Sequence, residues 1–193
     1  DKLLYIEEDI YTALAYYKKA AAQNHISAIL EIGLLFEEGV LGEVDYIEAY
    51  KNFLKARNLG SDVGSYYVAL YFQFGLGVEQ DIETAIDFYE EAIGRGNESA
   101  VIDLGILYVS GEFIKPNYKK AYYLFKPLAD KGIADALYNI GSMFEQGLYV
   151  KQNVEIAFDY YERAHNQDFP IASYAIGEFY YNGTIGKGPN FKL

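Results

Sequence analysis

Apolar residues recur at helical spacing in two kinds of segment that alternate along the chain. In residues 81–96, DIETAIDFYEEAIGRG, the residues Ala85, Tyr89 and Ala92 fall on one face of a helix. Residues 99–111, SAVIDLGILYVSG, carry a second apolar helical pattern. We name the segment typified by residues 99–111 helix A and the one typified by residues 81–96 helix B.

Both patterns return every 36 residues without insertion or deletion. Helix A carries an aromatic residue near its end, at Phe36, Phe72, Tyr108, Phe144 and Tyr180. Helix B carries one in its middle, at Tyr17, Phe53, Tyr89, Phe125 and Tyr161. The repetition predicts an all-α fold, an αα-superhelix (solenoid) of about five tandem 36-residue helix-pair repeats in one domain. The predicted repeats are residues 1–26 (partial), 27–62, 63–98, 99–134, 135–170 and 171–193 (partial).

Short polar residues and glycines mark the ends of helix B. A side-chain oxygen that can accept from the first-turn N–H groups opens the segment at Asp9, Asp45, Asp81, Asn117 and Asn153. Residues that tolerate the left-handed conformation close it at Asn24, Gly60, Gly96, Gly132 and Asp168. These positions are predicted N-caps and C-caps.

A small residue occupies the interior of every helix A. The series is Gly33, Ala69, Gly105, Gly141 and Gly177, although glycine costs a helix interior about 1 kcal/mol relative to alanine. We expect each small residue to face the aromatic ring of helix B, so that the two helices pack closely. Leucine at Gly105 is then expected to unfold the array locally.

Glycines at 75 and 77 raise the question of a phosphate-binding loop. The stretch GLGVEQ satisfies neither G-x-G-x-x-G after a strand nor G-x-x-x-x-G-K-[ST]. The equivalent loops keep the glycine at 39, 75, 111, 147 and 183, whereas Gly77 occurs in one copy. An ordinary connection between helix A and helix B is expected.

The combined pattern of small residue, aromatic, glycine, Asp/Asn, alanine and closing glycine resembles the Sel-one-like repeats, relatives of the tetratricopeptide repeats. The resemblance covers residues 9 to about 184. It implies a right-handed superhelix of antiparallel helix pairs that serves as an adaptor or scaffold for protein complexes. Because both ends cut a repeat, the sequence is expected to be a fragment that begins in the loop before a helix B.

Composition restricts the partners. The formal net charge is −12, which disfavours nucleic acid and anionic lipid and favours partners with basic or apolar segments. The chain has no cysteine, and no metal or cofactor is implied. No apolar window approaches about 18 residues, so direct membrane insertion is not expected. The compartment stays open between bacterial cytoplasm, periplasm or export and the endoplasmic-reticulum lumen, which the triplets at Asn97 and Asn182 permit.

Tyrosines and carboxylates dominate the variable positions of helix A. In tetratricopeptide-like arrays these positions line the concave wall, which is a natural place for recognition. The predicted partner-binding residues are Glu31, Tyr66, Tyr67, Phe74, Asp103, Tyr138, Asn139, Glu145, Tyr174, Glu178 and Tyr181. Tyrosine offers apolar area with a hydrogen-bonding tip, and carboxylates favour basic segments. We therefore expect a non-enzymatic protein-interaction scaffold with a concave, acidic, tyrosine-rich groove.

Three alternatives compete with this interpretation. Residues Leu30, Tyr66, Ile102, Tyr138 and Tyr174 could simply pack between successive A helices. The same groove could bind or process glycans, with Glu145 and Glu178 as the groups to mutate, or the array could be a structural spacer. An enzyme is not expected, because His25 and His165 occupy different repeat positions and match no catalytic or metal-binding spacing. A monomer is expected, with end-to-end contacts through exposed repeat ends as the alternative.

Overall fold

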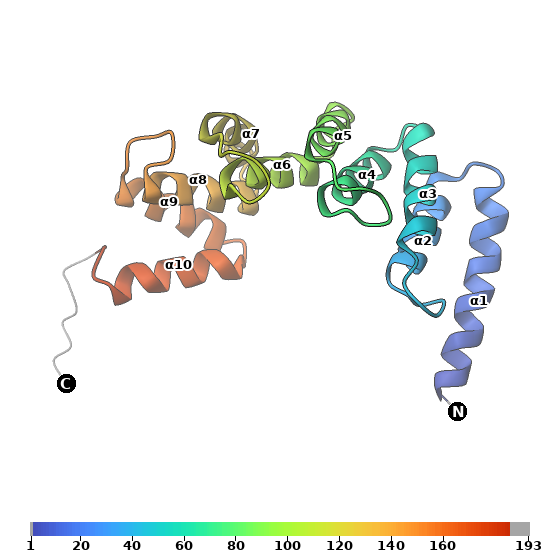
Figure 1. The fold of residues 1–193 in the computed structure, drawn as a ribbon. Helices are drawn as coiled ribbons and strands as arrows, with labels where there is room; N and C mark the ends of the chain where they lie inside the picture. The colour runs from blue at the N-terminus through green and yellow to red at the C-terminus, as the bar shows by residue number, and fades with distance from the viewer. Residues whose placement is uncertain (1, 186–193) are drawn as a thin grey trace. The chain divides into compact units, whose positions relative to one another are not determined.

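The computed structural model describes residues 2–185, with side chains described from residue 9 onward. The described residues form ten α-helices and no β-strand (Figure 1). This confirms the predicted all-α fold of alternating helices. Helix B corresponds to α1, α3, α5, α7 and α9, and helix A to α2, α4, α6, α8 and α10. Their bounds are α1 Lys2–Ala21, α2 Ile26–Glu37, α3 Tyr46–Asn58, α4 Asp62–Phe74, α5 Ile82–Gly94, α6 Glu98–Ser110, α7 Tyr118–Asp130, α8 Ala134–Gln146, α9 Val154–His165 and α10 Pro170–Tyr181.

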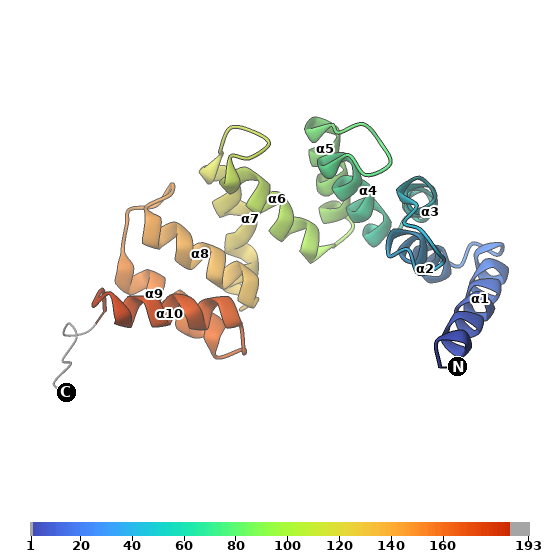
Figure 2. The same ribbon diagram turned by 60° about the horizontal axis from the view of Figure 1, so that its bottom comes forward.

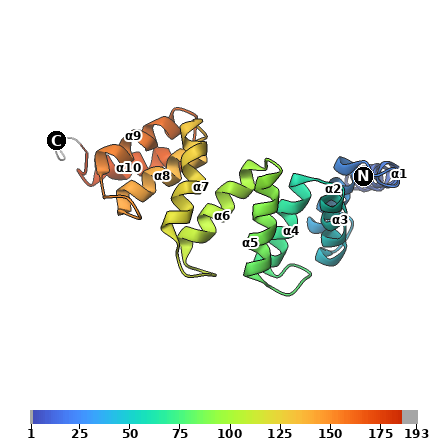
Figure 3. The same ribbon diagram turned by 90° about the horizontal axis from the view of Figure 1, so that it is seen from above.

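The chain divides into two compact units, one up to Ala100 and one from Val101 onward. In the first unit α2 packs against α1 and α3, and α4 packs against α3 and α5. In the second unit α8 packs against α7 and α9, and α9 packs against α10 (Figures 2 and 3). These helices thus pack against their neighbours in sequence, as a tandem helix-pair array requires.

Helix B begins the same way in four repeats. Oδ1 of Asp45 accepts from the Glu48 N–H at 3.0 Å, and Oδ1 of Asp81 accepts from the Thr84 N–H at 3.1 Å. Asn117 and Asn153 cap α7 and α9 in the same manner. The amide of each capping residue also donates to the carbonyl of the aromatic residue near the end of helix A, as between Asp81 and Phe72 at 2.9 Å. The pair of bonds fixes the loop between the helices.

Asp9 was predicted to be an N-cap, and this is wrong. The helix α1 already begins at Lys2, so Asp9 lies inside it. Residues 2–8, KLLYIEE, contain no glycine, proline or other turn residue, and Leu, Lys and Glu are good helix formers. The helix therefore extends toward the N-terminus beyond the capping position, and the expectation that the described chain starts in a loop is also wrong.

The closing residues of helix B adopt the left-handed conformation in all five repeats. Their φ angles are positive at Asn24, Gly60, Gly96, Gly132 and Asp168. After α3 the Ser61 N–H donates to the Ala56 carbonyl at 3.1 Å, and the Gly60 N–H donates to Arg57 at 2.9 Å. This arrangement satisfies carbonyl groups that the end of the helix leaves free.

Three A helices start with side-chain caps that the repeat pattern does not reveal. Oγ of Ser61 accepts from the Gly64 N–H at 2.9 Å, and Oδ1 of Asn97 accepts from the Ala100 N–H at 2.8 Å. Nδ1 of His25 accepts from the Ala28 N–H at 3.3 Å. The equivalent residues before α8 and α10 are Ile133 and Phe169, which make no side-chain cap. Because the position is not uniformly polar, it shows no repeating signal.

Three of the small residues of helix A, Gly33, Gly105 and Gly141, face the aromatic rings of helix B. A Cβ atom at Gly33 would lie 2.6 Å from the Phe53 ring, and one at Gly105 would lie 2.5 Å from Cζ of Phe125. Gly141 stands in the same relation to Tyr161, at 2.7 Å. Real Cβ contacts are not this short, so only glycine permits the spacing of these helices.

Gly177 does not follow the rule. A Cβ atom there would meet nothing within 4 Å, so the predicted packing role is wrong for this residue in the described structure. The reason is that no described helix B follows α10 to place a ring against it.

Candidate functional site

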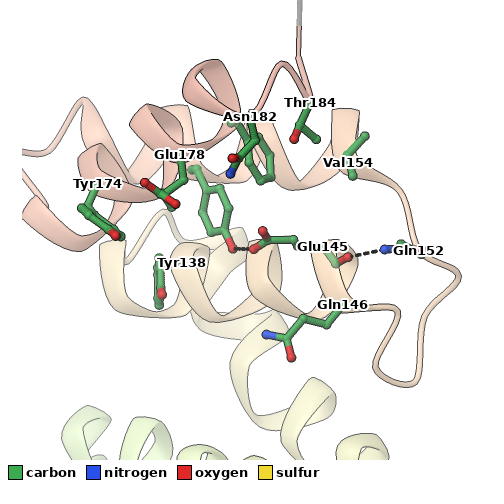
Figure 4. Close-up of a pocket in the computed structure, with 12 residues that line it drawn as sticks. Tyr138, Glu145, Gln146, Gln152, Val154, Tyr174, Glu178, Asn182 and Thr184 are labelled. Atoms are coloured by element: carbon green, nitrogen blue, oxygen red, sulfur yellow. Dashed lines mark hydrogen bonds between the residues drawn. The ribbon is translucent and has the colours of Figure 1, made fainter.

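A cavity of about 750 Å³ lies between α8 and α10 in the second unit (Figure 4). Four predicted partner-binding residues line it, with Tyr138 and Glu145 on α8 and Tyr174 and Glu178 on α10. Tyr138 and Glu145 are two helical turns apart and therefore share one face of α8. The full lining is Tyr138, Glu145, Gln146, Gln152, Val154, Tyr161, Tyr174, Ala175, Glu178, Phe179, Asn182 and Thr184.

Glu145 is held in place by two interactions. The hydroxyl of Tyr161 donates to its Oε2 at 2.6 Å, and Nε2 of Gln152 donates to its backbone carbonyl at 2.8 Å. Burial and the neighbouring Glu145 carboxylate raise the pKa of Tyr161 far above its usual value, so this hydroxyl remains a donor. The Glu145 carboxylate is thus an acceptor with one oxygen already engaged.

The α8 wall is more firmly packed than the α10 wall. The Tyr138 ring stacks on Tyr161 with centroids 5.3 Å apart and also contacts Phe169 at 5.9 Å. Burial raises the pKa of Tyr138, and the negative charge of Glu145 adds a smaller increase. On α10, by contrast, Tyr174 is 70% exposed and Glu178 is exposed as well. A ligand in the cavity would therefore meet one preorganised wall and one adaptable wall.

The cavity is acidic. Its lining includes the two carboxylates of Glu145 and Glu178 and no lysine, arginine or histidine. The other polar groups are neutral hydroxyls and amides. The electrostatic potential of such a lining favours a cation or a donor-rich group.

A second group of the predicted residues gathers in the first unit. Burial raises the pKa of Tyr67, and the negative charges of Glu37, Glu38 and Glu31 raise it further. The Tyr67 ring stacks on Phe53 with centroids 4.3 Å apart. Tyr67 therefore packs against Phe53 and also interacts electrostatically with the carboxylates of Glu37, Glu38 and Glu31.

The end of helix A carries a polar contact that sequence reasoning missed. Oε1 of Gln73 accepts from the Tyr89 hydroxyl at 2.6 Å, and two repeats later Oε2 of Glu145 accepts from the Tyr161 hydroxyl at the same distance. In the repeat between them the same two positions hold Val109 and Phe125, neither of which has a polar side-chain atom. A sequence signal was present in these three repeats, where a polar residue at the helix A position accompanies tyrosine in helix B and an apolar residue accompanies phenylalanine.

The first repeat breaks this pairing. Its helix B aromatic is Phe53, which has no hydroxyl to offer Glu37. Oε1 of Glu37 instead accepts from the Tyr71 hydroxyl at 3.2 Å. Burial raises the pKa of Glu37 above its usual value in spite of this bond.

The remaining predicted residues lie outside the cavity. In the first unit the Tyr66 ring is 6.2 Å from that of Tyr89, and Phe74 is exposed at the end of α4. In the second unit the cavity lining does not include Asp103, Asn139 or Tyr181. Conversely, Gln152, Val154, Tyr161, Phe179 and Thr184 line the cavity although they were not predicted, because the variable positions of helix A alone were considered.

The Gly75 and Gly77 loop has a structural explanation. Gly75 is the left-handed C-cap of α4 with φ of 69°. Gly77 has φ of 66°, and a Cβ atom there would lie 2.7 Å from the backbone of Tyr46. Both glycines are thus required by the turn and by close backbone packing.

Among residues 2–185 no group of three or more His, Cys, Asp and Glu side chains is placed to hold a metal ion. Within the same range, none of the helices combines the length and apolar character needed to cross a bilayer. His25 serves as an N-cap, and His165 is exposed in the last turn of α9 with Nδ1 2.8 Å from Oγ of Ser173.

Comparison with protein families gives matches along nearly the whole chain. The model of the Sel1 repeat matches six consecutive segments, residues 3–25, 26–61, 63–97, 99–133, 134–169 and 170–193. An uncharacterised Sel1-like repeat-containing protein of Schizosaccharomyces pombe is 28% identical over 99 residues, which is 51% of this chain and 15% of the yeast protein. The chain therefore spans a small part of the length of this relative.

Solved structures show the same architecture. A Sel1 repeat protein from Oxalobacter formigenes superimposes with a TM-score of 0.81 at 26% identity, over 96% of this chain and 78% of that one. The protein c5321, described as a protective antigen of uropathogenic Escherichia coli with an SLR fold, gives a TM-score of 0.76 at 25% identity, over 91% of this chain and 38% of that one.

Proposed function

Because the chain belongs to the Sel1 repeat family, whose members are generally protein-interaction scaffolds, we propose that it binds a partner protein without catalysing a reaction. The binding site in this proposal is the cavity between α8 and α10, and the ligand is an exposed segment of the partner. The observation that carries the proposal is the convergence of Tyr138, Glu145, Tyr174 and Glu178 on one cavity.

The chemistry of the lining supports a peptide ligand. Tyrosine provides a large contact area at a low cost in conformational entropy, and its hydroxyl can bond to a peptide backbone. The amides of Gln146 and Asn182 add donors and acceptors for main-chain groups. The net charge of −12 adds a long-range attraction for basic partners, which weakens as salt is added.

A peptide selection tests the proposal. The purified chain is used to select from a random peptide library displayed on phage, and the enriched peptides are synthesised for affinity measurement. Tyr174→Ala removes an exposed ring from the cavity, and we expect it to weaken binding about tenfold, as loss of an aromatic contact residue commonly does. Tyr16→Ala in α1 is the matched control, because Tyr16 is 67% exposed, close to the 70% of Tyr174.

Enriched peptides that bind both variants equally would place recognition elsewhere and contradict the proposal. Binding of oligosaccharides in place of peptides, lost in Tyr174→Ala, would favour the glycan alternative instead. Circular dichroism of each variant separates loss of binding from loss of fold.

A further inference from the structure

We infer that the cavity between α8 and α10 is specific for a guanidinium group, so that an arginine side chain of the partner segment enters it between Glu145 and Glu178. The inference rests on the proposed function and deepens it by naming the chemical group that is recognised. Four features of the cavity lead to it: charge, rigidity, aromatic walls and size.

The charges of the lining favour a cationic ligand. Glu145 and Glu178 lie on different helices and border one space that no lysine, arginine or histidine of the lining neutralises. An entering cation would gain a carboxylate on each side, whereas an anionic or purely apolar group would gain no such interaction. Each carboxylate has two oxygens, and the fork of a guanidinium matches that geometry.

The position of Glu145 is fixed before a ligand arrives. Tyr161 is a buried residue with 1% of its surface exposed, and its hydroxyl donates to Oε2 of Glu145 at 2.6 Å. This bond engages one oxygen of the carboxylate and limits its rotation. Binding therefore costs less side-chain entropy at this group than at a freely rotating glutamate.

The aromatic side chains favour arginine over lysine. Tyr138 on α8 and Tyr174 on α10 border the same cavity as the two carboxylates. A planar guanidinium stacks on aromatic faces and is more weakly hydrated than an ammonium group, so it loses less on entering a partly enclosed site. The volume of about 750 Å³ is within the range of about 300–1,000 Å³ of small-ligand sites, which accommodates one long side chain with its adjoining backbone.

Small probes test this chemistry directly. The chain labelled with ¹⁵N is titrated with N-acetyl-arginine amide, N-acetyl-lysine amide and N-acetyl-citrulline amide while amide resonances are recorded. Citrulline has nearly the shape of arginine but no charge. We expect the arginine probe to shift resonances of α8 and α10, and the citrulline probe to bind about tenfold more weakly, because charged hydrogen bonds are lost. Lysine is expected to fall between them.

Matched variants locate the charge. Glu178→Gln is expected to weaken arginine binding about tenfold, since one carboxylate of the pair is removed. Glu162→Gln in α9 makes the same charge change at an exposed residue that does not line the cavity, and it is expected to leave binding unchanged. Equal binding of arginine and citrulline, or equal effects of the two variants, would overturn the inference.

The proposed function can fail separately. Peptides selected by the chain are resynthesised with each arginine replaced by citrulline. If they depend on Tyr174 but tolerate citrulline, the guanidinium inference is overturned while the proposed function stands. If the arginine probe binds the cavity but no selected peptide depends on Tyr174, the proposed function is overturned and the guanidinium site stands.

Discussion

Alanine at Gly105 is the sharpest test of how the helix pairs pack. In α6 this residue faces the ring of Phe125, and an added Cβ atom would lie 2.5 Å from Cζ and 3.0 Å from Cδ1 of that ring. The Phe125 side chain is fully buried, so the ring has no open space into which to move. The change therefore adds one methyl group where Gly105 and the Phe125 ring are already closely packed.

Two effects of opposite sign decide the outcome. Alanine improves helix propensity over glycine by about 1 kcal/mol. Overpacking a rigid core costs about 1–3 kcal/mol, and the short contact with a fully buried ring places Gly105→Ala at the upper end of that range. We therefore expect a net destabilisation of about 2 kcal/mol, equivalent to a fall in Tm of about 4–8 °C for a chain of this size.

The assay is urea unfolding followed by circular dichroism, with Gly177→Ala as the matched control. Gly177 occupies the equivalent position of α10, but a Cβ atom there meets nothing within 4 Å. Only the propensity term acts at this residue, so stability should rise by up to about 1 kcal/mol. If both variants change stability in the same direction, the steric explanation for the glycines of helix A is refuted.

Three further predictions concern single side chains. Burial raises the pKa of Glu37, so its contribution to stability is present below the ordinary value of 4.5 and is lost as pH rises through the folded pKa; Glu37→Gln should therefore raise the urea midpoint at pH 7 more than at pH 4. Hydrogen bonds from Arg57 lower the pKa of Glu91. The stability that the Glu91 carboxylate contributes is therefore present above its ordinary pKa of 4.5 and is lost as pH falls through the lowered pKa. Glu91→Gln should lower the free energy of unfolding by about 1–3 kcal/mol at pH 7 and by less in acid, as measured by urea unfolding. An equal loss at both pH values would contradict the ion pair. Asn153→Ala should cost about 1 kcal/mol in thermal unfolding through loss of its cap on α9, and no change in Tm would contradict that role.

The repeat architecture was predictable because its determinants are local and recur at constant spacing. A cap such as Asp81, a left-handed glycine such as Gly96 and a small residue such as Gly105 each act within one helix pair. Repetition then distinguishes them from chance. The predictions for Asp9 and Gly177 were wrong because the surroundings of these two residues differ from those of their counterparts in other repeats. Asp9 follows a segment that is itself helical, and Gly177 faces no described helix.

The candidate site was predictable only in part. Helical periodicity placed Tyr138 and Glu145 on one face of α8, and the cavity indeed includes both. Periodicity within one helix could not show that Tyr161 donates to Glu145, or that Phe179 of α10 helps to line the space. These contacts depend on the angle and separation of neighbouring helices, which are set by packing and not by spacing along the chain.

Site-specific photo-crosslinking measures the central claim most directly. A benzophenone amino acid is placed at residue 174 in one variant and at the comparably exposed residue 16 in another, and each is irradiated with an arginine-containing peptide selected by the chain. If the peptide binds between α8 and α10, crosslinks form from residue 174 and not from residue 16. An excess of a competing peptide without arginine replacement by citrulline, added before irradiation, prevents them. Crosslinks that form equally from both positions, or from residue 16 alone, would contradict the account.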